Sequence, residues 1–250
     1  MKKKLIIITG GTKGIGLAIA KEFLKNKWKV IITGRSEPSF YKKNKNKNLK
    51  FFKMNVRFEK DHISLFKEAI NWNKTIDCLV NCAGMSSWRP IKLVDNSFVD
   101  MIFETNIKSV IWSCKQASIF MRAGSSIINM SSIASKRGSK NNSIYCASKF
   151  AVNGITQSLS REFGKKNIRV NALCPVNILT NGLKSAFKSN FSPTQGNTKK
   201  YMKNFIDQQS ALNKLPTKED IGYFCYFLAS DKSSHITGQS FNLDSGVVSS

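Results

Sequence analysis

Short apolar runs alternate with longer amphipathic segments along most of the chain. The runs are continuous and rich in β-branched residues, as expected for strands that are buried on both faces. The segments between them repeat apolar residues three and four positions apart, which predicts helices. Strands are predicted at 5–9, 29–33, 49–54, 76–81, 126–130, 168–173 and 240–243, and helices at 14–26, 60–73, 95–121, 143–164 and 217–229.

This alternation predicts the fold class. Strand–helix–strand units favour a parallel sheet whose faces are both covered. We therefore expect an α/β fold, a Rossmann-like doubly wound parallel sheet of about seven strands with helices on both faces, formed by one domain over residues 1–250. Two polar segments break the pattern, at 41–50 and at about 181–210. Because long insertions often cover a site, we expect the second to be a substrate lid.

The charge balance raises the question of partners. The chain has 40 Lys and Arg against 15 Asp and Glu, a net charge of +25, and 33 of the 40 cations are Lys. Proteins that read nucleic acid rely on Arg, so we expect no nucleic-acid partner and attribute most of the excess to composition. An anionic substrate remains open, since the lid segment carries five lysines: Lys184, Lys188, Lys199, Lys200 and Lys203.

Several classes of protein are excluded at this stage. The six cysteines are dispersed and the two histidines, His62 and His235, lie far apart, so no metal site is expected. The apolar run at 5–8 is too short for a signal peptide, and no stretch has the length of a membrane span. We expect reduced cysteines, a cytoplasmic location and no membrane association.

Three glycines follow the first predicted strand and lead directly into a helix. This arrangement lets the backbone turn sharply and presents free N–H groups at the helix N-terminus to a pyrophosphate. A tight turn without a ligand is the plainer alternative. The cofactor contacts expected here are Gly10, Thr12, Lys13, Gly14, Ile15 and Gly16.

The residue after the second strand predicts which nicotinamide cofactor binds. Enzymes that use NAD usually place an acidic residue there to bind the ribose hydroxyls, whereas this chain has Arg35. Together with Lys13, Arg35 would suit a 2′-phosphate. The sequence therefore predicts NADP(H) in preference to NAD(H).

A catalytic group is predicted where a helix follows the fifth strand. Tyr145 and Lys149 are four residues apart, so their side chains share one face of the helix. A nearby ammonium, together with a cationic nicotinamide ring, would lower the pKa of the phenol towards neutrality and allow acid–base work. Ser131 and Ser132 lie at the end of the fifth strand, where a serine hydroxyl can hydrogen-bond a substrate carbonyl.

Taken in order, these motifs resemble the short-chain dehydrogenase/reductase family, including its 3-oxoacyl-[acyl-carrier-protein] reductase-like members, over nearly the whole chain. The matching motifs are TGxxxGxG at 9–16, Asn81-Cys82-Ala83-Gly84, Asn106, and the set of Ser132, Tyr145 and Lys149. The resemblance implies that Tyr145 exchanges a proton with the substrate oxygen and that Lys149 binds the nicotinamide ribose. It also implies that Ser132 orients the carbonyl and that Asn106 completes a water relay.

The resemblance implies further contacts and an assembly. Additional cofactor contacts are expected at Asn55, Val56, Asn81, Ala83, Gly84, Ile178 and Thr180. Val176 stands where the family usually has glycine and would narrow the pocket. The family also implies a homo-oligomer, a tetramer or a dimer, built in part through the long central helices.

We therefore expect an NADP(H)-dependent carbonyl reductase or alcohol dehydrogenase with a small-molecule substrate. Anionic candidates are a 3-oxoacyl thioester and a nucleotide sugar. One alternative is a non-catalytic nucleotide-sensing or nucleic-acid-binding protein on the same fold, although a pure binder does not need all four residues of the Asn–Ser–Tyr–Lys set. Another is an oxidoreductase that works mainly in the oxidative direction on a sugar or polyol.

Overall fold

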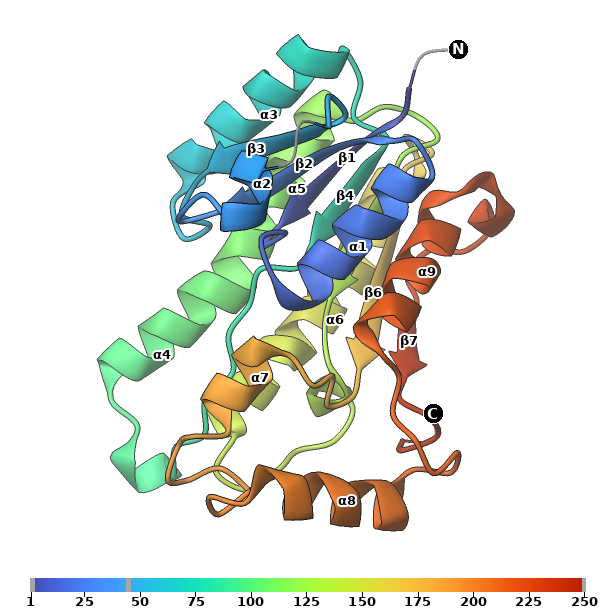
Figure 1. Cartoon of the computed structure of the whole chain (residues 1–250). Coiled ribbons are helices and arrows are strands. Elements are labelled where there is room, and N and C mark those ends of the chain that lie inside the picture. Colours follow the sequence, from blue (N-terminus) through green and yellow to red (C-terminus); the bar gives the residue numbers. More distant parts are fainter. Residues whose placement is uncertain (1–2, 44–45, 249–250) are drawn as a thin grey trace.

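A seven-stranded, entirely parallel sheet forms the centre of the molecule (Figure 1). The computed structural model describes residues 3–43 and 46–248. The strand order is β3-β2-β1-β4-β5-β6-β7, which confirms the predicted Rossmann-like fold. The strands are β1 (Leu5–Thr9), β2 (Lys29–Gly34), β3 (Leu49–Lys53), β4 (Cys78–Asn81), β5 (Ser126–Met130), β6 (Arg169–Pro175) and β7 (Ser240–Leu243).

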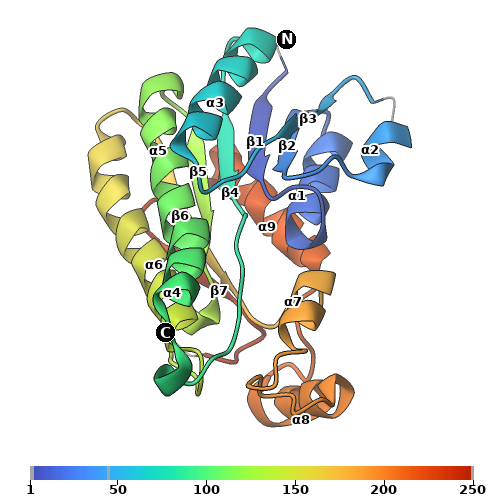
Figure 2. The ribbon, with the colours of Figure 1, turned by 90° about the vertical axis from the view of Figure 1, so that its left-hand side faces the viewer.

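Helices cover both faces of this sheet (Figures 1 and 2). On one face α1 packs against α9, and on the other lie α3, α5 and α6. The helices are α1 (Gly14–Lys25), α2 (Ser39–Lys43), α3 (Glu59–Asn73), α4 (Asn96–Phe103), α5 (Ser109–Phe120), α6 (Ser143–Gly164), α7 (Asn181–Ala186), α8 (Thr198–Gln209) and α9 (Lys218–Ala229).

The continuous apolar run of β1 is explained by the two helix layers. Successive side chains of a strand point to opposite faces. Ile6 and Ile8 accordingly join the core under α1 and α9, whereas Leu5 and Ile7 join the core under α3, α5 and α6. All four are fully buried. The apolar run from Leu5 to Ile8 therefore reflects burial on both faces of the sheet.

The predicted helix at 95–121 is interrupted, which corrects the sequence analysis. Helix α4 ends at Phe103, a π-helical turn covers Glu104–Lys108, and α5 begins at Ser109. The apolar spacing continues through the turn, so periodicity alone does not reveal it. Such π turns often occur at functional sites, and this one contains Asn106.

The two polar segments contain helices that the sequence pattern did not predict. The stretch at 41–50 overlaps the end of α2 and the start of β3, and residues 44–45 lie outside the described part. The 181–210 segment holds α7 and α8. Helix α8 lies across the edge of the sheet where the strands end (Figure 1). Among the described residues, no helix combines the length and apolar character that crossing a membrane requires.

Candidate functional site

The glycine turn between β1 and α1 has the backbone shape that the sequence predicts. Gly10 and Gly14 have φ values of +68° and +55°, in the region that favours glycine. A Cβ on Gly16 would lie 2.5 Å from the carbonyl oxygen of Gly10, so a side chain does not fit there. Lys13, at the N-cap, makes no side-chain capping bond. The first N–H groups of α1 are therefore available to an anion.

A polar hollow of about 130 Å³ adjoins this turn. The side chain of Thr180 lies against Gly14, where a Cβ would meet its Cγ2 at 3.4 Å, and its Oγ1 accepts a bond from Leu183 N at 3.2 Å. The segment after β6 is thus held beside the glycine turn. Residues lining the hollow are Lys13, Gly14, Leu179, Thr180, Asn181, Gly182 and Lys218. Two cations and two backbone turns around one space fit the phosphates of a dinucleotide.

The end of β2 is drawn close to the same turn. A Cβ on Gly34 would lie 2.7 Å from Cγ2 of Thr12, so the Thr12 side chain packs against the Gly34 backbone. Arg35 and Lys13 are the residues that follow Gly34 and Thr12 in the sequence. Both are exposed, and within the described residues neither takes part in an ion pair.

The segment after β4 packs directly on the glycine turn. Thr9 Oγ1 accepts the backbone N–H groups of Cys82 and Ala83 at 3.1 and 3.2 Å. Gly10 is so close that a Cβ there would meet Cα of Ala83 at 2.9 Å. The Ala83-Gly84 backbone therefore forms one wall of the predicted cofactor site.

Asn81 has a structural role that its sequence motif does not reveal. Its Oδ1 accepts a bond from Ser113 at 2.6 Å, and its Nδ2 donates to Asn129 at 2.9 Å. Asn129 in turn donates to Thr156 on α6 at 2.9 Å. This buried amide ladder ties β4 and β5 to the helices behind them. The side chain of Asn81 is therefore engaged within the protein, which leaves its backbone for the predicted cofactor contact.

Asn55 and Val56, the predicted adenine contacts, lie in a turn held by the start of α3. Asp61 Oδ2 accepts the N–H of Asn55 at 2.8 Å, and the ring of His62 bonds to the carbonyl of Val56 at 2.9 Å. His62 is fully buried, and burial lowers the pKa of its imidazole. Sequence reasoning assigned no role to Asp61 or His62, because their contacts cross a turn that periodicity does not describe.

Ser132, Tyr145 and Lys149 meet at the carboxyl end of β5. A hydrogen bond joins the side chains of Ser132 and Tyr145. Lys149 is buried, and its Nζ lies 5.7 Å from the ring centroid of Tyr145 and donates to the carbonyl of Met130 at 2.8 Å. The structure thus brings together Tyr145 and Lys149, which the helical spacing selects, and Ser132, which the resemblance selects.

Burial dominates the acid–base properties of this group. It raises the pKa of Tyr145 to about 12, while the hydrogen bond from Ser132 works in the opposite direction. Burial also lowers the pKa of Lys149 to about 8. The expected lowering of the phenol pKa is therefore not found in the protein alone, where the loss of water around the phenol raises it and Ser132 is the group that lowers it. The phenol is held in its neutral, proton-donating form.

Asn106 lies beside these residues but holds a loop. Its Oδ1 accepts Met85 N at 2.9 Å, and its Nδ2 donates to Met85 O at 2.9 Å and to Ser148 Oγ at 3.0 Å. A Cβ on Gly84 would lie 3.4 Å from Asn106 Oδ1 and 3.6 Å from Lys149 Nζ. The amide therefore adjoins Lys149, and its oxygen has a second lone pair for a water.

The segment after β6 and the 181–210 lid lie on the side of the site opposite the loop that Asn106 holds. Val176 and Ile178 are buried, and Ile178 packs in the core, so only its backbone is offered to a cofactor. Phe187 stacks near Trp88 with ring centroids 5.4 Å apart and near Tyr201 at 5.5 Å. The aromatic residues of the lid thus bind it to the loop after β4, beyond packing among themselves.

Polar contacts also connect the lid to the turn after β5 and to the segment after β6. Both terminal nitrogens of Arg137 donate to Gln209 Oε1, at 3.1 and 3.2 Å. A hydrogen bond joins the side chains of Tyr201 and Asn177. Sequence reasoning did not select these four residues, since nothing in their local spacing indicates the pairing.

Residues 3–43 and 46–248 contain no group of three or more His, Cys, Asp or Glu side chains that could hold a metal ion.

Comparison with known proteins agrees with this geometry. The family model described as enoyl-(acyl carrier protein) reductase matches residues 10–248. The chain is 30% identical over 246 residues to dehydrogenase/reductase SDR family member 6 of Aquarana catesbeiana, covering 97% of this chain and 96% of that protein. It is 31% identical over 255 residues to 3-oxoacyl-[acyl-carrier-protein] reductase FabG of Chlamydia trachomatis, covering 98% and 97%.

A solved structure shows the same fold. The ligand-free aldohexose dehydrogenase (AldT) of Thermoplasma acidophilum superposes with a TM-score of 0.87 at 26% identity, covering 98% of this chain and 94% of that one. Fold, motif order and full-length similarity agree, and they favour an enzyme over a non-catalytic binding protein. The chain belongs to the short-chain dehydrogenase/reductase family, enzymes that act on CH–OH groups with NAD(P).

Proposed function

We propose that this protein is an NADP(H)-dependent oxidoreductase that interconverts a carbonyl and an alcohol through Asn106, Ser132, Tyr145 and Lys149. The observation that carries the proposal is the hydrogen bond between Ser132 and Tyr145, with the Lys149 ammonium 5.7 Å from the same ring. A substrate oxygen placed between the two hydroxyls would meet a proton donor and a second hydrogen-bond donor at once.

Each residue has a distinct task in this mechanism. Tyr145 holds its proton because burial raises the pKa of its phenol, and it passes that proton to the substrate oxygen during reduction. Ser132 holds the same oxygen in position. Lys149, fixed to the Met130 carbonyl, stabilises the charge that develops as the phenol loses its proton. The free lone pair of Asn106 Oδ1 holds the relay water that returns a proton.

The cofactor residues fit a dinucleotide. Gly10, Thr12, Lys13, Gly14, Ile15 and Gly16 surround the pyrophosphate position, Asn55 and Val56 the adenine, and Asn81, Ala83, Gly84, Tyr145, Lys149, Ile178 and Thr180 the nicotinamide half. When bound, the nicotinamide ring supplies or accepts the hydride. The polar hollow between Lys13 and Lys218 and the uncapped start of α1 support this assignment.

The proton-transfer role is tested by Tyr145→Phe. We expect turnover with a ketone and NADPH to fall at least about 100-fold, since general acid catalysis typically contributes that much. Tyr223→Phe, which removes an exposed hydroxyl on α9, is the matched control and retains activity. Full activity in Tyr145→Phe would overturn the mechanism.

The preference for NADP(H) rests on Arg35 and Lys13, which are exposed and directly follow Gly34 and Thr12, two residues in contact. A charge-assisted bond to the 2′-phosphate contributes roughly 1.5–3 kcal/mol. We therefore expect Arg35→Gln to weaken NADPH binding by about 10- to 100-fold and to leave NADH binding unchanged. Lys21→Gln, an exposed lysine on α1, is the control. Equal losses for both cofactors in Arg35→Gln would contradict the preference.

For the substrate we propose a small carbonyl or alcohol with an anionic part beneath the 181–210 lid. The five lid lysines are exposed and α8 lies across the sheet edge that carries the site (Figure 1). The Chlamydia relative is named for a 3-oxoacyl thioester, whereas the Thermoplasma enzyme is named for an uncharged sugar. A panel of 3-oxoacyl thioesters, nucleotide sugars and neutral sugars, run in both directions, decides between these classes.

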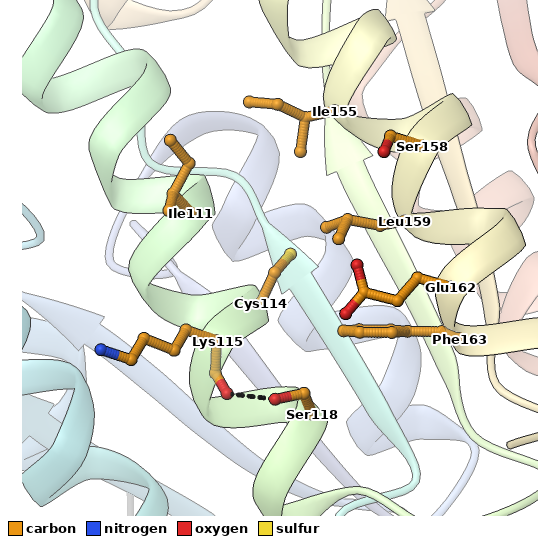
Figure 3. Close-up of a pocket in the computed structure, with 9 residues that line it drawn as sticks. All are labelled: Ile111, Cys114, Lys115, Ser118, Ile155, Ser158, Leu159, Glu162 and Phe163. Atoms are coloured by element: carbon orange, nitrogen blue, oxygen red, sulfur yellow. Dashed lines mark hydrogen bonds between the residues drawn. The ribbon is translucent and has the colours of Figure 1, made fainter.

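We also propose that residues 1–250 form a single domain and that the chain forms a homo-oligomer through the face of α5 and α6. A hollow of about 420 Å³ opens there between the two helices, lined largely by apolar side chains such as Ile155, Leu159 and Phe163 (Figure 3). Ile111 at its rim is 40% exposed. Light scattering should show a multiple of 28.0 kDa. Ile111→Glu should reduce the assembly, whereas Ile91→Glu, an exposed apolar residue outside this face, should not.

A further inference from the structure

Helix α6 carries a third polar residue on the face of Tyr145 and Lys149. Asn153 follows them at the same four-residue interval, so the three side chains form one stripe along the helix. Asn153 is 9% exposed, and the proposed reaction makes no use of it. Because burying an amide is costly unless it is hydrogen-bonded, its partners indicate what it does.

Those partners lead to the turn that carries Ser132. Asn153 Nδ2 donates to Ser135 Oγ at 2.8 Å, and Ser135 Oγ donates to the main-chain carbonyl of Ser132 at 2.6 Å. Ser135 is itself 3% exposed. Cys174, near the end of β6, completes the cluster, with its Sγ 3.8 Å from Asn153 Oδ1 and 3.5 Å from Ser135 Oγ. Every polar atom of this buried cluster thus has a partner.

The cluster acts on Ser132 through the backbone. Ser132 is the N-cap of a 3-10 turn (Ile133–Ser135), and its Oγ accepts the N–H of Ala134 at 3.2 Å. Its carbonyl accepts both the N–H of Ser135, at 2.9 Å, and the hydroxyl of Ser135. The second of these bonds connects the turn to Asn153. The orientation of the Ser132 side chain therefore depends on a helix that is distant from it in sequence.

We propose that Ser135 and Asn153 are positioning residues that fix Ser132 relative to Tyr145, because the Asn153–Ser135–Ser132 chain starts from the same helix face as Tyr145. This inference rests on the proposed roles of Ser132 and Tyr145. The helix thereby sets both ends of the substrate-oxygen site: Tyr145 directly, and Ser132 through two hydrogen bonds.

This arrangement affects proton transfer as well as placement. The hydrogen bond from Ser132 lowers the pKa of Tyr145 against the effect of burial. The other titratable groups that face the phenol are Lys149 on α6 and the thiols of Cys146 and Cys174. If Ser132 moves away, the phenol loses its stabilising donor and the pKa of Tyr145 rises further. A purely structural role for Ser135 would leave that pKa unchanged.

The test compares Ser135→Ala and Asn153→Leu with Ser160→Ala. Ser160 is also buried on α6, and its hydroxyl donates within the helix to Gln157 O at 2.7 Å. We expect roughly a 10- to 100-fold fall in kcat for Ser135→Ala and Asn153→Leu, the size of a small misplacement of a reacting group. The KM for NADPH should stay unchanged, and the double variant should be no worse than the more severe single one.

Two further measurements separate positioning from stability. The pH profile of alcohol oxidation should shift to higher pH in Ser135→Ala and stay in place in Ser160→Ala. Crystal structures of Ser135→Ala and Ser160→Ala should show the Ser132 hydroxyl displaced only in Ser135→Ala. This result does not depend on turnover. Wild-type kcat and an unmoved pH profile in both Ser135→Ala and Asn153→Leu would overturn the proposal. An absence of turnover in the wild type would instead count against the proposed function.

Discussion

Replacing Lys149 with methionine should abolish turnover and change stability in a pH-dependent way. The stability of Lys149→Met relative to the wild type should be higher at neutral pH than at alkaline pH. Lys149 is 6% exposed, and its Nζ has one protein partner among the described residues, the carbonyl of Met130 at 2.8 Å. Methionine fills similar space without a charge. The substitution therefore removes the cost of holding an ammonium away from water.

The size of that cost follows from the pKa of Lys149. Burial lowers it from 10.5 to about 8, a change of about 2.5 units, and each unit corresponds to about 1.36 kcal/mol. Below pH 8 both the folded and the unfolded chain carry the proton, so the full penalty of about 3 kcal/mol applies. Between pH 8 and 10.5 the folded chain has released the proton and the unfolded chain has not, so stability rises with pH.

The comparison should run from pH 7 to pH 9.5. Over this interval the wild type should gain about 2 kcal/mol relative to Lys149→Met, which is roughly 4–8 °C in Tm for a chain of this size. The ionisation of Tyr145 limits the upper end of this pH interval. Because burial raises its pKa from 10.0 to about 12, the folded protein loses stability above pH 10 as unfolded tyrosine ionises.

Urea unfolding of the two proteins in parallel measures this difference, since other titrating groups contribute equally to both. Loss of the bond to Met130 shifts the variant by a constant amount at every pH and leaves the slope intact. A stability difference that does not change between pH 7 and 9.5, or one that changes in the opposite direction, would refute the lowering of the Lys149 pKa by burial.

Two further predictions concern the cofactor turn and the helix layer. Gly16→Ala should weaken NADPH binding at least about 10-fold in a fluorescence titration, because its Cβ would lie 2.5 Å from Gly10 O. Gly154→Ala on α6, where a Cβ meets nothing within 4 Å, should bind normally and gain about 0.5–1 kcal/mol. Thr217→Ala breaks the capping box with Asp220 that begins α9 and should lower stability by about 1 kcal/mol in urea unfolding, with kcat unchanged. Unaltered NADPH affinity in Gly16→Ala, or unaltered stability in Thr217→Ala, would contradict these assignments.

The strands were largely predictable from the sequence. The apolar runs identify all seven strands, because most of their side chains face one of the two helix layers, although buried polar residues such as Asn129 and Asn171 interrupt β5 and β6. Strand ends were less certain. β4 begins at Cys78 instead of residue 76, and β6 continues to Pro175, because pairing with the neighbouring strands decides where a ladder stops.

The reacting residues were predictable for a different reason. Tyr145 and Lys149 are one helical turn apart, so local geometry is enough to place them on one face. The residues that support them were not. Asn81, Asn153 and Ser135 are ordinary polar residues in the sequence, and their importance depends on partners from 18 to 48 positions away.

By itself, the sequence determined the fold class, the glycine turn, and the shared helix face of Tyr145 and Lys149, because each depends on hydrophobic period or on spacing within one element. Ser132, in a different element, was identified by the resemblance to the family. Only the tertiary structure decided the π turn at Asn106, the engagement of the Asn81 side chain, and the bonds that join Ser132 to α6. The physical reason is that burial removes water as a partner. A buried polar group must then find its hydrogen bond wherever the fold brings another chain segment to it.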